Sequence, residues 1–240
     1  MSWIQYAKDR VKTLKFGLAP YLAIMAVLGG LLLIQRDTDT LVIIAGTGIV
    51  MFWVGGMRMK HIGLAGLVLL AVVAGVIAVR PYALERVKTY LDPGANAQGS
   101  GYQINQSLIA IGSGGLTGRG FGQSIQKFGY LPQPTDDSIF AVAGEEFGLL
   151  GGIVLLGLYC AFAGSAFRIG TRSPDPFGGL VAIGFSVLVI AESFLNMAAM
   201  LGIAPVSGVP LLFVSHGGTA LIIILAAAGI VANISKYARL

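Results

Sequence analysis

Six long apolar stretches constrain this chain more than any other feature of its sequence. A helix that crosses a membrane needs about 20 mostly apolar residues, and about 17 to 25 are tolerated. The glycines and alanines within these stretches suit helices that pack closely in a membrane. We therefore predict an all-α polytopic membrane protein with six transmembrane helices, at residues 16–34, 41–57, 62–79, 147–167, 177–204 and 211–234.

The composition agrees with a membrane protein. Of the 240 residues, 55% are hydrophobic and only 11% are charged, whereas a soluble domain carries about 25% charged residues. The single cysteine, Cys160, excludes a disulfide framework, and with two histidines the chain offers little for a zinc site. No cleavable signal peptide is predicted, because the first apolar stretch is too long and no small-residue cleavage site follows it.

The basic residues between the stretches predict the orientation. Lysine and arginine concentrate in short cytoplasmic loops. Most of them flank one set of helix ends, at Lys8, Arg10, Lys12, Lys15, Arg58, Lys60, Arg168, Arg172, Lys236 and Arg239, whereas the opposite face receives Arg36 and the long segment that begins at Arg80. We predict that both termini are cytoplasmic. The chain is then one integral membrane domain (1–240), with three helices in 16–79, an extracytoplasmic loop in 80–138 and three helices in 139–240.

The outer loop is the predicted place of function, since ordered loops longer than about 15 residues are usually functional. It opens with the basic amphipathic piece "RPYALERVKTYLDP", and residues 104–111 form a short apolar helix predicted at the membrane interface. The glycine-rich run "GSGGLTGRGFG" lacks the Gly-Lys-Ser/Thr ending of a phosphate loop, and no strand precedes it. We favour a flexible turn that lets the backbone pass close to a helix or a ligand.

Four of the eleven acidic residues lie close together before the fourth apolar stretch, at Asp136, Asp137, Glu145 and Glu146. Asp137 precedes Ser138 and an apolar run, as a helix-capping residue does. On a continuous helix Glu145 would lie about 12 Å further along the axis, beyond the roughly 5 to 9.5 Å between the carboxyl groups of a glycosidase. The spacing disfavours a two-carboxylate hydrolase. Asp137 then either acts alone or only caps and solvates the helix start.

Glu145 and Glu146 enter an apolar stretch, where a charge costs about 2.5 to 3.5 kcal/mol. Such residues normally face a water-filled cavity or a cation, and Arg119 and Lys127 are the cations available in the outer loop. Two interfacial glutamates still in contact with water are the alternative.

Polar residues also occur in the later stretches. Glu192 and Asn196 are four apart and share a helix face. Ser215 and His216 are adjacent, and adjacent helical residues do not face each other, which disfavours a serine–histidine nucleophile pair. Hydrogen bonds between helices are the expected role of Ser215 and Asn196.

Five longer pieces of the chain carry a resemblance to a known family. They are "QRDTDT" (35–40), "TYLDP" (89–93), "GYQINQSLIAIGSGGLTGRGFGQSIQKFGYLP" (101–132), "DSIFAVAGEEFGLLGG" (137–152) and "PVSGVPLLFVSHGGTALI" (205–222). With these pieces the chain resembles the shape, elongation, division and sporulation (SEDS) family, which includes FtsW and RodA. The resemblance implies the C-terminal part of a ten-helix fold that begins near the fifth helix. The chain departs from the family pattern at a few positions. Glu192 stands where the family usually has glutamine, Leu212 where it has proline and His216 where it has tyrosine, and "QRDTDT" stands in place of Gln-Pro-Asp-x-Gly-Thr.

The resemblance implies a peptidoglycan glycosyltransferase of the bacterial cytoplasmic membrane. Such an enzyme polymerises lipid II, a polyprenyl-diphosphate-linked disaccharide, at the outer membrane face for cell division or cell shape. Asp137, rather than Asp136, matches the family's essential aspartate and is implied to be the general base for the acceptor sugar's 4-hydroxyl. We hypothesise that a partly dry site beside Glu145 and Glu146 raises the pKa of Asp137.

Further expectations concern substrate and partners. Arg119 and Lys127, with a divalent cation such as Mg²⁺ or Mn²⁺, are expected to bind the diphosphate. The full set of predicted substrate-binding residues is Gln106, Arg119, Gln126, Lys127, Glu145, Glu146, Ser215 and His216. The expected partners are a class B penicillin-binding protein transpeptidase and other division or elongation proteins, with no nucleic acid.

Two other classes of function stay open: a lipid II flippase, and a non-catalytic scaffold fragment of the division machinery. A transporter should place ionisable residues deep in broken helices. Only Glu192 is predicted to lie deep, which favours the enzyme.

Overall fold

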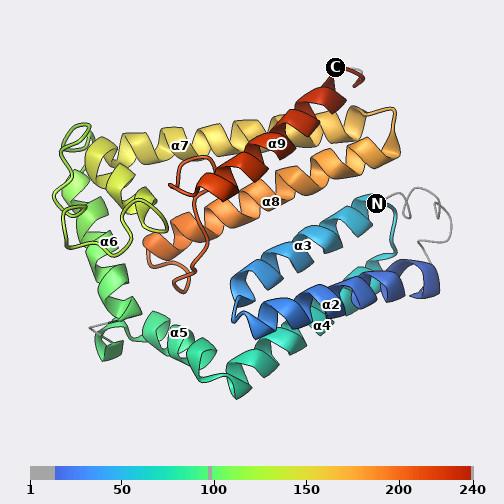
Figure 1. Cartoon of the computed structure of the whole chain (residues 1–240), viewed down its shortest axis with the longest axis horizontal. Helices are drawn as coiled ribbons and strands as arrows, with labels where there is room; N and C mark the ends of the chain where they lie inside the picture. The colour runs from blue at the N-terminus through green and yellow to red at the C-terminus, as the bar shows by residue number, and fades with distance from the viewer. Residues whose placement is uncertain (1–13, 97–98, 239–240) are drawn as a thin grey trace. The chain divides into compact units, whose positions relative to one another are not determined.

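The computed structural model describes residues 14–96 and 99–238, and these form helices and loops without strands (Figure 1). The prediction of an all-α protein is confirmed. Lys8, Arg10, Lys12 and Arg239 lie outside the described residues. In chain order the elements are η1 (Leu14–Leu18), α2 (Ala19–Ile34), α3 (Thr38–Val54), α4 (Met59–Val79), α5 (Pro81–Leu91), η2 (Pro93–Asn96), α6 (Ser100–Gly114), α7 (Ile139–Arg172), α8 (Pro176–Met200) and α9 (Gly218–Ser235).

Each of the six predicted apolar stretches contains an apolar helix. Four of the described helices, α4, α7, α8 and α9, are long and apolar enough to cross a membrane. The other two, α2 and α3, are equally apolar but have 16 and 17 residues.

Helix α7 begins at Ile139, directly after the predicted capping position of Asp137, and the apolar stretch predicted from residue 147 is its later part. Glu145 and Glu146 therefore lie inside the helix. One predicted boundary near the outer loop is wrong. Helix α9 begins at Gly218 rather than at residue 211. The apolar residues before α9 form an irregular segment, 201–217, because Pro210 lacks an amide hydrogen and Gly202 and Phe213 have positive φ. Leu211 is nevertheless fully buried.

The chain forms two compact units. The first comprises the described parts of Met1–Val76, Phe162–Ala191 and Ala226–Leu240. In it α2 and α3 lie side by side (Figure 1). The ring of Tyr21 packs edge-on against Phe52 with 5.3 Å between the ring centres, and its hydroxyl donates to the carbonyl of Ala45 at 2.8 Å. Asp37 caps α3 by accepting a hydrogen bond from the Thr40 amide at 3.0 Å.

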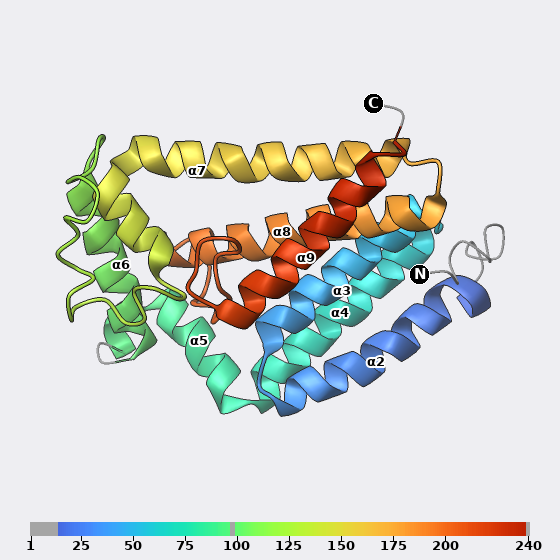
Figure 2. The same ribbon diagram turned by 45° about the horizontal axis from the view of Figure 1, so that its top comes forward.

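The second unit comprises Ile77–Ala161 and Glu192–Leu225. It contains α5, α6, the segment that joins α6 to α7, the first part of α7, the end of α8 and segment 201–217. Its small apolar core joins α6, the outer loop and α7 through Ala110, Leu131, Ala141 and Val142. Figure 2 shows the first part of α7 at an angle to the rest of that helix. Every predicted site residue lies in this unit.

Candidate functional site

The bend in α7 lies at Gly148, whose backbone is non-helical (φ 65°, ψ −164°). In a regular helix the amides of Leu149 and Leu150 would bond to the carbonyls four residues earlier, which belong to Glu145 and Glu146. Segment 115–120 takes up all four groups instead. The Leu149 and Leu150 amides donate to the Gly115 and Leu116 carbonyls at 2.9 and 3.1 Å, and the Glu145 and Glu146 carbonyls accept from the Arg119 and Gly120 amides at 3.0 Å each.

The glycine-rich run permits this close passage of two backbones. A Cβ atom at Gly118, which has φ of +78°, would lie 2.1 Å from the Glu146 carbonyl oxygen. One at Gly114 would lie 2.1 Å from the carbonyl oxygen of Gly144, and one at Gly148 would lie 2.4 Å from the amide nitrogen of Gly118. The run therefore lets the outer loop approach a helix backbone, as the turn interpretation predicted.

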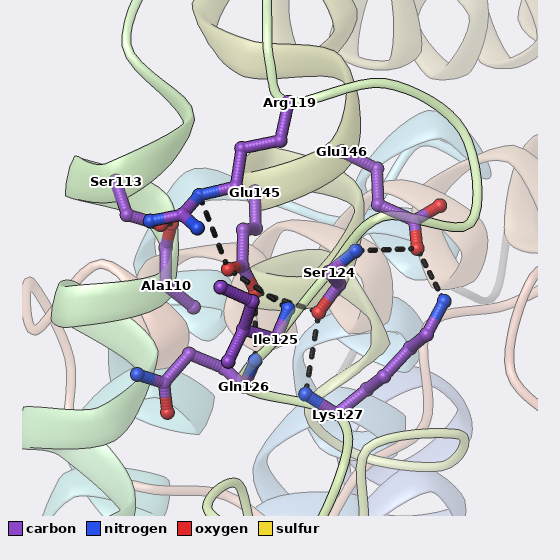
Figure 3. Close-up of polar contacts among 9 residues, drawn as sticks. All are labelled: Ala110, Ser113, Arg119, Ser124, Ile125, Gln126, Lys127, Glu145 and Glu146. Carbon is purple, nitrogen blue, oxygen red and sulfur yellow. Dashed lines mark hydrogen bonds and ion pairs between the residues drawn. The ribbon is translucent and has the colours of Figure 1, made fainter.

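The two glutamate side chains bind the next part of the same loop (Figure 3). The Glu145 carboxylate is fully buried; it accepts from the Ser124 hydroxyl at 2.6 Å and from the Ile125 and Gln126 amides at 3.1 and 3.2 Å. The Arg119 Nε lies 3.5 Å from it. The predicted pairing of these acids with cations of the loop is present, and the alternative of water-exposed glutamates is wrong for Glu145.

Glu146 is nearly as buried, with 6% of its surface exposed. It accepts from the Lys127 ammonium at 2.7 Å and from the Ser124 amide at 3.4 Å. Lys127 also donates to the Gly122 carbonyl at 3.0 Å. Together the backbone and side-chain bonds fasten loop 115–127 to α7.

Asp137 lies before α7, in a segment that is held through its backbone. The Asp137 carbonyl accepts from the Asn196 side-chain amide at 2.8 Å, and the Asp136 carbonyl accepts from the Ser215 hydroxyl at 2.7 Å. The next residue, Ser138, donates its hydroxyl to the Pro132 carbonyl at 2.8 Å. These contacts fix the backbone of the segment, and both aspartates line a cavity.

Ser215 and Asn196 therefore bind loops, whereas hydrogen bonds between helices were expected. Asn196 also donates to the Val209 carbonyl at 2.8 Å, and Ser215 accepts from the Leu211 amide at 2.8 Å. The expectation failed because residue 215 lies in segment 201–217 rather than in a helix.

Asp137 borders two cavities. One, of about 340 Å³, is also lined by Asp136, Ser215, His216 and the apolar residues Leu211, Leu212 and Leu221. The other, of about 470 Å³, is also lined by Arg86, Tyr102, Gln103, Gln133 and Gly208. Asp137 and Gln133 thus line both cavities.

The electrostatic surroundings of Asp137 differ from those hypothesised from the sequence. Burial is the main cause that raises the pKa of the Asp137 carboxyl, the neighbouring Asp136 carboxylate raises it further, and the Arg86 guanidinium lowers it. Asp136 thus has the role that the sequence hypothesis gave to Glu145 and Glu146. Those two acids are neutralised by the loop instead.

The predicted site residues therefore fall into two groups. The first joins Asp137 with Ser215 and His216 around one cavity. The second is the cluster of α7 with loop 115–127, which holds Arg119, Gln126, Lys127, Glu145 and Glu146. Gln106 lies in α6 and belongs to neither group of contacts. The sequence did not indicate Arg86, Tyr102 and Gln103, which line the second cavity. Only the basic amphipathic character of 80–93 marks Arg86 in the sequence.

A divalent cation would find few protein ligands here. Among the described residues no three His, Cys, Asp or Glu side chains lie together to hold a metal ion. Magnesium, however, is commonly bound by one or two carboxylates together with substrate phosphates. Asp136 and Asp137, which line one cavity together, fit that limited requirement.

Comparison with known proteins identifies the family to which this chain belongs. Residues 2–240 match the family model of the FtsW, RodA and SpoVE cell cycle proteins. The chain belongs to this family, as the resemblance predicted, and it is an integral membrane protein.

Two curated relatives are similar over nearly the whole chain. Stage V sporulation protein E of Bacillus subtilis is 38% identical over 232 residues, 97% of this chain and 63% of the relative. A probable peptidoglycan glycosyltransferase FtsW of Trichlorobacter lovleyi is 38% identical over 237 residues, 99% of this chain and 62% of the relative. The chain thus spans less than two thirds of the length of these relatives.

Solved structures share the fold. A chain of a peptidoglycan synthase complex, described for its coordination of polymerization and crosslinking, aligns with a TM-score of 0.78 at 26% identity, over 99% of this chain and 67% of that chain. The rod shape determining protein RodA of Thermus thermophilus aligns with a TM-score of 0.61 at 24% identity, over 99% of this chain and 64% of that chain.

Proposed function

We propose that this protein is a peptidoglycan glycosyltransferase that polymerises lipid II at the outer face of the bacterial cytoplasmic membrane. One observation carries the proposal: Asp137, the aspartate singled out by the family pattern, borders two cavities while its backbone is held by Asn196. Relatives named as probable peptidoglycan glycosyltransferases and a similar chain in a peptidoglycan synthase complex support it.

In this proposal Asp137 is the general base. It takes the proton from the 4-hydroxyl of the acceptor sugar while that oxygen forms a bond to the anomeric carbon of the donor. The bond from that carbon to the diphosphate oxygen breaks, and the diphosphate leaves with the electron pair. A general base works best when its pKa is near the working pH. The raised pKa of Asp137 is a shift in that direction.

The diphosphate that leaves carries the negative charge and needs neutralisation rather than a proton. A divalent cation, Mg²⁺ or Mn²⁺, would supply that charge when bound, and Asp136 is the carboxylate available to hold it. Arg119 and Lys127, the diphosphate contacts expected from the sequence, both pair with buried glutamates, so in this proposal they hold loop 115–127 on α7 and are not assigned to the diphosphate.

The finer localisation and the partners belong to the same proposal. The basic residues between the helices support cytoplasmic termini by the positive-inside rule. The similar structure from a peptidoglycan synthase complex supports a class B penicillin-binding protein as partner, together with other division or elongation proteins.

A polymerisation assay tests the function. The purified protein and its transpeptidase partner are supplied with labelled lipid II, and the glycan strands are separated by length. We expect polymer from the wild type, none from Asp137→Asn, and undiminished polymer from Glu85→Gln, which neutralises an exposed acid of α5. Transfer of lipid II across the bilayer without polymer would indicate a flippase, and neither activity would indicate a scaffold.

A further inference from the structure

The polar cavity beside Asp137 has no role in the proton transfer described above. It lies within the second unit, between α5, the start of α6, the segment that precedes α7, and segment 201–217. The hydroxyl of Tyr90, near the end of α5, donates to the Ile203 carbonyl at 2.8 Å and so ties α5 to segment 201–217. The walls of this cavity are therefore linked to each other.

The Asp137 carboxylate lies close to Gly208 in this cavity. A Cβ atom built on Gly208 would be 3.9 Å from Oδ2 of Asp137 and would meet no other heavy atom within 4 Å. The absence of a side chain at Gly208 therefore keeps the space in front of the carboxylate open.

Arg86 gives the cavity its positive charge. Its side chain is half-buried, lines the cavity, and acts on the Asp137 carboxylate electrostatically. A guanidinium presents a planar fork of donors that matches two phosphate oxygens at once. The Gln103 side-chain amide is already used in a hydrogen bond to the Ser138 hydroxyl at 3.0 Å. Arg86 is thus the charged donor among the residues that line this cavity.

Arg119 and Lys127 of the outer loop were expected from the sequence to bind the diphosphate, but each forms an ion pair with a glutamate of α7. Arg119 lies 3.5 Å from the fully buried Glu145, and Lys127 lies 2.7 Å from Glu146. Recruiting either cation to a ligand would leave a buried carboxylate without its counter-charge, which is costly.

We propose that Arg86 binds the diphosphate group of a polyprenyl-linked donor in the cavity between α5 and Gly208. The assignment rests on the proposed glycosyltransferase function and names the part of the substrate that this cavity takes. It brings the leaving group and Asp137 to the same cavity.

Binding of soluble probes tests the proposal without turnover. The full chain in phosphatidylcholine nanodiscs is titrated with farnesyl diphosphate, inorganic pyrophosphate and farnesol. We expect farnesyl diphosphate to bind the wild type and Arg86→Gln to weaken it by about tenfold or more, as loss of a charge-assisted phosphate contact requires. Lys88→Gln removes an exposed charge two residues away on α5 and should bind as the wild type does. Inorganic pyrophosphate should follow the same order, and farnesol should not respond to Arg86.

Two further variants separate this site from the catalytic assignment. Gly208→Val narrows the cavity and keeps the Arg86 guanidinium, and it should also weaken the binding of farnesyl diphosphate, which covers the case in which Arg86→Gln fails to fold. Asp137→Asn removes a negative charge beside the ligand and should bind it as tightly as the wild type or more tightly. Equal affinity in the wild type and Arg86→Gln, or in the wild type and Gly208→Val, would overturn the proposal. Polymer formation by Asp137→Asn would refute the general base and leave the diphosphate site standing.

Discussion

Two pairs of adjacent acids stand at the start of α7, and they are used in opposite ways. Glu145 and Glu146 direct their side chains into the protein, where hydrogen bonds and ion pairs from loop 115–127 surround them. Asp136 and Asp137 bind the protein through their backbone carbonyls, and their carboxylates line cavities. A buried carboxylate surrounded by donors holds a structure together. A carboxylate on a fixed backbone at a cavity wall is available for chemistry.

The largest effect on stability should follow from removal of the Glu145 side chain. Glu145→Ala leaves the Ser124 hydroxyl and the Ile125 and Gln126 amides without their acceptor. We expect the free energy of unfolding to fall by about 3 kcal/mol or more. Thermal unfolding in nanodiscs measures this. An unchanged midpoint would mean that loop 115–127 does not depend on Glu145.

Two glycines of the same loop offer a matched pair. Gly118 and Gly122 have nearly equal φ, +78° and +79°, but a Cβ would meet the Glu146 carbonyl oxygen at 2.1 Å only at Gly118, and no atom within 4 Å at Gly122. Alanine at either position pays a conformational penalty of about 1 kcal/mol. Gly118→Ala must in addition push the loop off α7. Its unfolding midpoint should therefore fall well below that of Gly122→Ala, and equal midpoints would refute the close backbone approach.

A smaller loss of stability is expected at the partly exposed end of the cluster. Lys127→Met removes the ion pair to Glu146, but the Ser124 amide still donates to that carboxylate. Since a quarter of the Lys127 side chain is exposed to solvent, the expected loss is about 1 kcal/mol. Lys88→Met on α5 is the matched control. A loss as large as that of Glu145→Ala would show that the two glutamates contribute alike.

The smallest expected effect is a displacement of the pH profile. The base acts when ionised, so polymerisation should fall as the pH drops through the pKa of Asp137, which burial and Asp136 raise. Asp136→Asn removes the second cause and should move this acid limb to lower pH. Arg86→Gln removes the charge that lowers the pKa and should move the limb to higher pH. Rates measured across the pH range with saturating lipid II check both directions, and shifts of opposite sign would contradict the assignment.

The sequence predicted the helical class well, because a bilayer requires long apolar helices with internally bonded backbones. It failed where apolar residues are buried by protein in a loop, as at Leu211 in segment 201–217. The capping position of Asp137 indicated the start of α7, but the predicted apolar span began only after Glu145 and Glu146, because two adjacent glutamates look incompatible with an apolar helix until loop 115–127 neutralises them. Those partners lie about 20 positions away in the chain, as the separation of Ile125 from Glu145 shows.

The site was only partly predictable for a related reason. Spacing argued against a carboxylate pair, but it left Asp137 as either a base or a cap, and the family pattern made the choice. Arg86 was missed because a basic amphipathic helix is typical of a membrane surface. Its place beside Asp137 depends on how α5, α6 and segment 201–217 fold together, which no local pattern records.

The most direct test of the contrast between the two acid pairs is one paired measurement on Asp137→Asn and Glu145→Gln. For each variant, glycan polymer is quantified per folded molecule and the unfolding midpoint is determined in the same nanodiscs. Asp137→Asn should make no polymer and unfold no earlier than the wild type, since a raised pKa means that ionised Asp137 lowers stability at neutral pH. Glu145→Gln should unfold earlier, while its folded molecules still polymerise. A stable, inactive Glu145→Gln together with an active Asp137→Asn would contradict the account.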